Sequence, residues 1–183
     1  MKEFPYHTVD TAPEEAKPIL ENAKKAFGMT PNLLRKMAEA PALLESYWQL
    51  KDIFSRSSLS PAEQQVVLMA VSASNGCTYC VAVHSTLADM VKVPDEVTEA
   101  LRNGQPIPDA RLEALRHFTQ TLVEARGWAA DAEVKAFLDA GFTQAQVLEV
   151  VLGVGFKTLS NYTNHLVHTE LDPAFQPRVW EGS

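Results

Sequence analysis

The chain has two cysteines, Cys77 and Cys80, and His84 follows the second one by four positions. Asn75-Gly76 precede this C-x-x-C-x-x-x-H run and predict the end of one helix, so Cys77 is expected to open the next. Each helical residue turns by about 100°, which places the two thiols and the imidazole on one face, where they could touch. A thiol at a helix start meets free backbone N–H groups and the positive end of the helix dipole, and both favour the thiolate.

Two neighbouring thiols can perform redox chemistry, because one thiolate attacks an oxidant and the other thiol reaches the resulting sulfenic acid. His84 lies one turn after Cys80, so it is expected to take the Cys80 proton or to return one to a leaving oxygen. This relation favours Cys80 as the attacking thiol. The opposite assignment, in which Cys77 attacks because it lies nearer the helix end, stays open on spacing alone.

Other interpretations of the run compete with redox chemistry. Buried cysteines and a nearby histidine can simply pack in a core. Two thiolates and an imidazole also suit zinc, but the candidates for a fourth ligand lack the spacing of zinc modules: His7, His117, His165 and His168. A c-type haem needs histidine directly after the second cysteine, where this chain has Val81, and a thioredoxin-like domain needs strands. We therefore expect neither a metal nor a cofactor.

Length and composition favour one ordinary domain over residues 1–183, because 46% apolar residues can build a real core. A net charge of −7 without a basic cluster argues against a nucleic-acid partner. The first residues lack the apolar stretch of a secretory signal, and no window reaches the length of a membrane span. We expect a cytoplasmic protein, in which a C-x-x-C pair serves poorly as a structural disulfide.

Helix signals occur along the whole chain, and no alternating strand-like pattern accompanies them. The clearest start is residues 60–63, where Ser60 and Glu63 can form a capping box around a proline at the first helical position. The sequence predicts an all-α fold, with an N-terminal helical segment at 1–55 and a core at 56–170. Its helices are expected at 14–27, after 30–31, at 41–54, from 61, from 77, and at 94–101, 109–126, 131–140 and 144 to about 168.

The last of these helices changes character along its length. Residues 147–156 are apolar nearly all round the axis, which predicts a place in a core or a subunit interface. Residues 157–165 are mostly polar. They indicate either a helix that emerges into water, which is the general rule, or the polar wall of a pocket. In the second case Tyr162 and His165 are candidates for a proton route.

Residues 59–63, 75–80 and His84 together resemble the core of the AhpD-like alkylhydroperoxidases, within the carboxymuconolactone decarboxylase superfamily. Residues 152–165 resemble its peroxidase-related subgroup. The resemblance implies an all-helical fold, a homo-oligomer of three or six subunits, and reduction of organic hydroperoxides by a cysteine pair that a dithiol or protein partner re-reduces. It also implies that Cys80 is peroxidatic and Cys77 resolving.

The chain departs from this family pattern at two positions. The well-studied alkylhydroperoxidases carry a glutamate twelve residues before the first cysteine, where it feeds a proton relay, and here that residue is Gln65. An amide can orient the histidine or a water but cannot act as its base. Glu63 is the nearest carboxylate, but it points elsewhere on a straight helix and is needed for the capping box. Tyr79 stands between the cysteines, where those enzymes often have histidine, and could donate a hydrogen bond to a peroxide oxygen.

These observations predict a thiol-dependent peroxidase that reduces small-molecule hydroperoxides. A redox switch without turnover and a decarboxylase-type enzyme are the competing hypotheses. The cysteine pair favours the peroxidase, because the decarboxylase branch of the superfamily lacks it.

Overall fold

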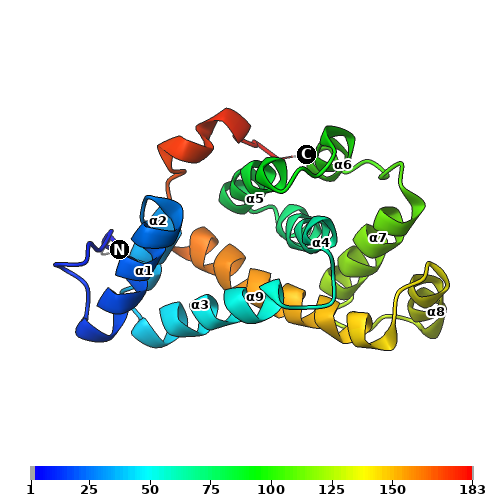
Figure 1. Ribbon diagram of the computed structural model, residues 1–183, viewed down its shortest axis with the longest axis horizontal. Helices are drawn as coiled ribbons and strands as arrows, with labels where there is room; N and C mark the ends of the chain where they lie inside the picture. Colours follow the sequence, from blue (N-terminus) through cyan, green and yellow to red (C-terminus); the bar gives the residue numbers. More distant parts are fainter. Residues whose placement is uncertain (1–2, 183) are drawn as a thin grey trace.

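A computed structural model describes residues 3–182, and its regular structure there is helical without a β-strand (Figure 1). The predicted all-α fold is therefore confirmed. Its elements in chain order are the 3-10 helix η1 (Glu14–Ala16), α1 (Lys17–Phe27), α2 (Asn32–Met37), α3 (Pro41–Ser55), α4 (Pro61–Ser74), α5 (Thr78–Met90), α6 (Asp95–Arg102), α7 (Ala110–Glu124), α8 (Asp131–Asp139), α9 (Gln144–Val167) and the 3-10 helix η2 (Pro173–Arg178).

The local start signals act as the sequence predicts. Ser60 accepts from the backbone N–H of Glu63 while the Glu63 side chain accepts from the N–H of Ser60, which completes the capping box of α4. Thr143 and Gln146 cap α9 in the same way. The helix bounds lie within a few residues of those expected. Two features differ: residues 14–16 form a 3-10 turn before α1, and η2 was not predicted.

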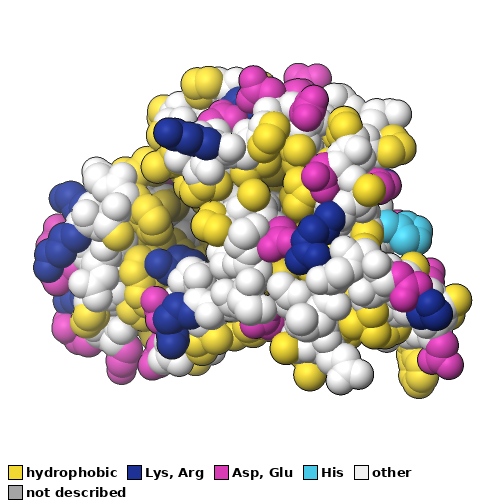
Figure 2. All heavy atoms as spheres, turned by 45° about the vertical axis from the view of Figure 1, so that its right-hand side comes forward, with side chains coloured by type: hydrophobic (Ala, Val, Ile, Leu, Met, Phe, Trp, Pro, Cys, Tyr) yellow, Lys and Arg dark blue, Asp and Glu magenta, His cyan; other side chains and the backbone are white. Residues whose placement is uncertain are grey.

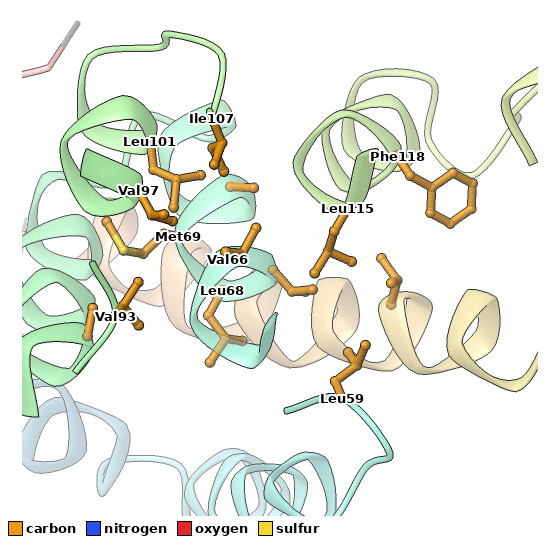
Figure 3. Close-up of a cluster of buried hydrophobic side chains, with 14 of the residues drawn as sticks. Leu59, Val66, Leu68, Met69, Val93, Val97, Leu101, Ile107, Leu115 and Phe118 are labelled. Carbon is orange, nitrogen blue, oxygen red and sulfur yellow. The ribbon is translucent and has the colours of Figure 1, made fainter. Parts of the chain in front are cut away.

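Helix α4 is the centre of the fold. Figure 1 shows it surrounded by α5, α6, α7 and α9, and it packs against each of them. Its residues 66–72 are all buried, so this helix is apolar nearly all round, as a core helix must be. Figure 3 shows its Val66, Leu68 and Met69 packed in one cluster with Leu101 of α6 and Leu115 of α7.

A second, smaller cluster joins the N-terminal helices to the start of α5. It contains both cysteines and Tyr79 together with buried leucines of α1, α2 and α3, including Leu20, Leu33 and Leu44. The N-terminal helical segment therefore covers the cysteines, which lie at the edge of the larger core.

The surface carries mixed charge. On the face shown in Figure 2, acidic and basic side chains are interspersed, and hydrophobic side chains line a hollow beside one basic side chain. Within residues 3–182, no single helix is long and apolar enough to cross a membrane, although the sharply bent pair α8 and α9 passes that test together.

Candidate active site

The turn between α4 and α5 places the first cysteine at a helix start. Gly76 adopts φ +64°, a left-handed conformation that glycine accepts at little cost, and the backbone N–H of Cys77 donates to the backbone oxygen of Ser72 at 2.9 Å. Cys77 is the N-cap of α5, and Cys80 lies within its first turn. The predicted position of the cysteines at a helix start is therefore confirmed.

Both thiols are free and 1% exposed, and one amide contacts both of them. Asn164 of α9 lies with Nδ2 3.2 Å from Cys80 Sγ and 3.8 Å from Cys77 Sγ. Cys80 also lies 3.9 Å from the hydroxyl of Ser160, one turn earlier on α9. A charged sulfur accepts hydrogen bonds strongly, so the Asn164 amide, which is nearer to Cys80, suits a thiolate at Cys80 better than at Cys77.

A buried lysine stands beside the thiols and binds the histidine. Lys157 of α9 is 1% exposed, and its Nζ lies 3.0 Å from Nε2 of His84. The other ring nitrogen, Nδ1, lies 2.9 Å from Oε1 of Gln65 on α4. An ammonium group only donates, so Nε2 accepts and Nδ1 carries the proton that is donated to Gln65. His84 is therefore held as one neutral tautomer by partners on both sides.

Lys157 forms no ion pair with a carboxylate among residues 3–182. Burying an unbalanced charge costs several kcal/mol after relaxation, so a nearby anion would stabilise it. The thiolate form of Cys80 is such an anion, and its charge would offset that of Lys157.

The same contacts move the thiol pKa values apart. Burial alone would raise the pKa of Cys80, but hydrogen bonding with Cys77, the charge of Lys157, and hydrogen bonds from Asn161 and Ser160 hold it well below its ordinary value. Hydrogen bonding with Cys80, followed by burial, raises the pKa of Cys77. The arrangement therefore favours a thiolate at Cys80 beside a protonated Cys77.

Burial also acts on the histidine. It lowers the pKa of His84 well below the ordinary value, and the positive charge of Lys157 lowers it further. His84 consequently stays neutral near pH 7. It makes no hydrogen bond to either sulfur among the described residues, so the direct Cys80–His84 proton transfer expected from the i,i+4 spacing is replaced by a contact with Lys157.

Gln65 takes the orienting role that an amide allows, because its oxygen fixes the tautomer of His84. Glu63 does not join it. Its carboxylate accepts from the Ser60 N–H and pairs with Arg111 at 3.0 Å, so it caps α4 and ties α4 to α7.

Tyr79 is turned away from the role of a peroxide donor. Its hydroxyl donates to Asp172 at 2.7 Å, and Asp172 also accepts from the backbone N–H of Asn32 at the start of α2. Burial, and then the charge of Asp172, raise the pKa of Tyr79. Tyr79 thus anchors α5 to α2 and to the C-terminal segment.

The polar part of α9 has a buried inward face, so the interpretation as a helix emerging into water is wrong for that face, and Asn164 on it lines a pocket beside Cys77. Lys157, Ser160, Asn161 and Asn164 are all at most 5% exposed, at positions i, i+3, i+4 and i+7. Tyr162 lies on another face, is 56% exposed and lines a separate groove between α7 and α9. The structure therefore does not bring Tyr162 to the thiols.

The inward polar residues were missed as site residues, although a signal was present. They continue the buried register of Val150, Gly153 and Phe156, which the apolar half of the helix already defines. Tyr47 of α3 was also missed. It packs on Phe156 with ring centroids 4.9 Å apart, and burial, followed by the nearby Cys80, raises its pKa.

One pocket of about 300 Å³ reaches the first cysteine of the pair. Cys77 lines it at the start of α5, and His165 lies in its wall. The remaining wall consists of Thr78, Tyr79, Asn164, His168, Thr169 and Glu170. Cys77 is thus the sulfur nearer to solvent, while Cys80 lies behind it. Within residues 3–182, no group of three or more His, Cys, Asp or Glu side chains is arranged to hold a metal ion.

Comparison with known proteins shows what this chain is similar to in sequence and in fold. Residues 38–121 match the sequence model of the carboxymuconolactone decarboxylase family, and this segment contains both cysteines, His84 and Gln65. Over this segment the chain is similar to the members of that family. Its fold is that of the AhpD-like proteins, as the solved structures below show, so the predicted resemblance is confirmed.

Two of these structures are peroxidase-related proteins. One, an AhpD core protein from Ralstonia eutropha JMP134, has a TM-score of 0.86 at 20% identity, with 98% of this chain and 97% of that chain covered. The other, from Silicibacter sp. TM1040, has a TM-score of 0.81 at 20% identity, with 97% and 94% covered.

A third similar structure is a cysteine-to-alanine variant of the debrominase Bmp8 in complex with 2,3,4-tribromopyrrole. It has a TM-score of 0.80 at 14% identity, with 97% of this chain and 95% of that chain covered. Among curated proteins, none matches the sequence. Proteins that share this fold thus carry names that refer to more than one chemistry.

Proposed function

We propose that this AhpD-like protein is a thiol-dependent peroxidase that reduces organic hydroperoxides through Cys80 and Cys77. The observation that carries the proposal is the buried Lys157, which has no carboxylate partner among the described residues and whose charge lowers the pKa of Cys80. The Asn164 amide donates to the same sulfur. Together they supply the reactive thiolate that attack on a peroxide requires.

The first step transfers one oxygen atom. The Cys80 thiolate attacks the terminal oxygen of the hydroperoxide, the O–O bond breaks, and Cys80 becomes a sulfenic acid while an alkoxide leaves. An alkoxide is a strong base, so a proton source must be close. Cys77 keeps its proton and lines the pocket, so it gives that proton to the alkoxide and releases an alcohol.

The second step closes the disulfide. The Cys77 thiolate formed in the first step attacks the Cys80 sulfur, and hydroxide leaves. Hydroxide takes a proton from the Lys157 ammonium group, which held the proton originally lost by the Cys80 thiol. The sum is one hydroperoxide and two thiols converted to an alcohol, water and a disulfide. In this scheme His84 and Gln65 position Lys157.

Turnover needs an external dithiol, of small-molecule or protein type. Its thiolate attacks the Cys77 sulfur, which lines the pocket, and Cys80 leaves as the thiolate of lower pKa. The second thiol of the reductant then attacks the mixed disulfide on Cys77. This releases Cys77 as a thiol and leaves the reductant as a disulfide. This requirement suits a reducing compartment such as the cytoplasm, where we propose that the protein acts.

The proposal includes a homo-oligomer, trimeric or hexameric. Helix α9 leaves a row of large apolar residues uncovered in the chain described: Leu148, Val151, Tyr162 and Leu166 are between 51% and 70% exposed. A substitution of Leu148 by glutamate is expected to lower the mass measured by light scattering if this row is an interface.

The decisive experiment uses the matched pair Cys77→Ser and Cys80→Ser with a sulfenic-acid trap and mass analysis. Peroxide-treated Cys77→Ser should accumulate a trapped sulfenic acid on Cys80. In Cys80→Ser, peroxide should oxidise the remaining thiol of Cys77 at least tenfold more slowly than it oxidises Cys80 in Cys77→Ser. Trapping on the sulfur of Cys77 instead would reverse the assignment. Continuous consumption of hydroperoxide by wild type with a dithiol supports an enzyme, whereas a switch would react once and stop.

Decarboxylase-type and debrominase-type chemistry can be separated from peroxide reduction in further assays. Lactone turnover that survives alkylation of both thiols would support a decarboxylase-type enzyme. Because a debrominase shares the fold, 2,3,4-tribromopyrrole should be offered as a substrate in the thiol-oxidation assay. Faster thiol oxidation by this compound than by hydroperoxides would overturn the proposed function.

A further inference from the structure

Two residues that line the same pocket each carry a buried polar atom without a hydrogen-bond partner. Among the described residues, Oδ1 of Asn164 and Oγ1 of Thr169 are both buried and unpaired, and both residues lie in the pocket wall beside Cys77. Asn164 as a whole is only 5% exposed. Buried polar atoms without partners are rare and destabilise the folded chain, so two of them beside one cavity point to a ligand that would pair with them.

The two atoms are held in place by the end of α9. The backbone oxygen of Asn164 accepts from the N–H of His168, the residue that ends the helix with φ +49°, and from the N–H of Thr169 at 3.4 Å. A 180° rotation of the Asn164 side-chain amide would remove the hydrogen bond from its Nδ2 to Cys80, and a thiolate needs that donor. Its oxygen must therefore point away from the sulfur.

We propose that Asn164 and Thr169 bind the hydroperoxide directly, and this inference rests on the proposed function. A hydroperoxide has one O–H donor and two acceptor oxygens. Asn164 Oδ1 accepts the O–H of the oxygen under attack, and the Thr169 hydroxyl donates to the oxygen that leaves. The same asparagine thus contacts both the attacking sulfur and the substrate, which brings the reacting atoms together.

The pocket also defines a class of substrate. Its volume of about 300 Å³ is at the lower end for ligand sites, and Thr78, His165 and Glu170 are among the lining residues. A pocket of this volume accommodates a small hydroperoxide but not a long acyl chain. Hydrogen peroxide and tert-butyl hydroperoxide are therefore expected to react faster than linoleic acid hydroperoxide.

The test compares Thr169→Val with Thr98→Val. Thr98 carries another unpaired buried hydroxyl, but it lies in α6 and outside the pocket. Each variant is measured for the rate at which tert-butyl hydroperoxide oxidises Cys80 and for the rate of alkylation by iodoacetamide, which reports the thiolate without needing a peroxide site. Retention of the alkylation rate also shows that the variant is folded.

Thr169→Val should oxidise at least tenfold more slowly with an unchanged alkylation rate, and Thr169→Ser should recover most of the loss. Thr98→Val should match wild type in both rates. Asn164→Leu should lose more in oxidation than in alkylation, because it loses the substrate contact as well as the donor to sulfur.

Oxidation of Thr169→Val at the wild-type rate, or equal losses of both rates in Asn164→Leu, would overturn the assignment of these residues. Faster reaction of wild type with linoleic acid hydroperoxide than with the two small peroxides would overturn the substrate class. A wild type that reacts with none of the three would instead overturn the proposed function, so the two failures can be told apart.

Discussion

Nζ of Lys157 lies 3.0 Å from Nε2 of His84, and these two residues are 73 positions apart in the chain. The contact makes the histidine an acceptor for a buried ammonium group, with Gln65 holding its other nitrogen. The imidazole therefore positions a cation next to the thiols.

Replacing Lys157 with methionine should raise the pKa of Cys80, because the nearby positive charge is lost while the buried volume is kept. In wild type the alkylation rate should stay high as pH falls from 9 and decline only near the lowered Cys80 pKa. In Lys157→Met the alkylation rate should instead be low near pH 7 and rise as the pH approaches 9. The peroxide rate at pH 7 should drop by roughly tenfold or more.

Lys36→Met is the matched control, because Lys36 is 3% exposed but binds the Phe4 carbonyl and the Tyr6 ring, away from the thiols. Its pH profile of alkylation should match that of wild type. Identical profiles for Lys157→Met and wild type would show that Lys157 does not act on Cys80.

Changing Gln65 to glutamate should raise the pKa of His84, because a carboxylate in place of the amide oxygen stabilises the charged imidazole. The shift can be followed in the NMR signals of the His84 ring across pH 5–8. Gln120→Glu adds the same charge beside Arg116 on α7 and should leave the His84 signals unchanged. An unmoved His84 titration in Gln65→Glu would contradict the orienting contact.

Stability should fall on acidification in a way that depends on His84. Its folded pKa is lowered, so below about pH 6.5 the unfolded chain binds a proton that the folded chain refuses, and stability is lost as pH falls. Urea unfolding at pH 7.5 and pH 5 should show a smaller loss in His84→Gln, by on the order of 1 kcal/mol. The exposed His117→Gln variant should keep the wild-type difference, and equal losses in all three proteins would count against a buried neutral His84.

Two glycines of α9 should respond in opposite directions to alanine. A Cβ at Gly153 would lie 2.7 Å from Val67 and 2.9 Å from Phe54, so Gly153→Ala should destabilise the protein by about 1–3 kcal/mol. A Cβ at Gly155 meets nothing within 4 Å, so Gly155→Ala should stabilise it by about 0.5–1 kcal/mol. Thermal unfolding of both variants measures the contrast, and a stabilised Gly153→Ala would argue against the close packing of α9 on α3 and α4.

The helices were predictable because their signals are local. Ser60 and Glu63 are three positions apart, and the contact between them forms wherever that segment becomes helical. The place of Cys77 at a helix start follows in the same way from Asn75-Gly76. By itself the sequence determined the all-α fold, most helix starts and the position of both cysteines within one helical turn.

The environment of the thiols depended on contacts between distant segments. Lys157 and Asn164 reach His84 and Cys80 only because α9 packs on α5 with that face inward, and the spacing of polar residues did not say which face that was. Tyr79 is adjacent to Cys80 in sequence, yet its hydroxyl donates to Asp172, 93 positions away. Side-chain direction and the depressed pKa of Cys80 were decided by tertiary structure, because burial and charge act through space and not along the chain.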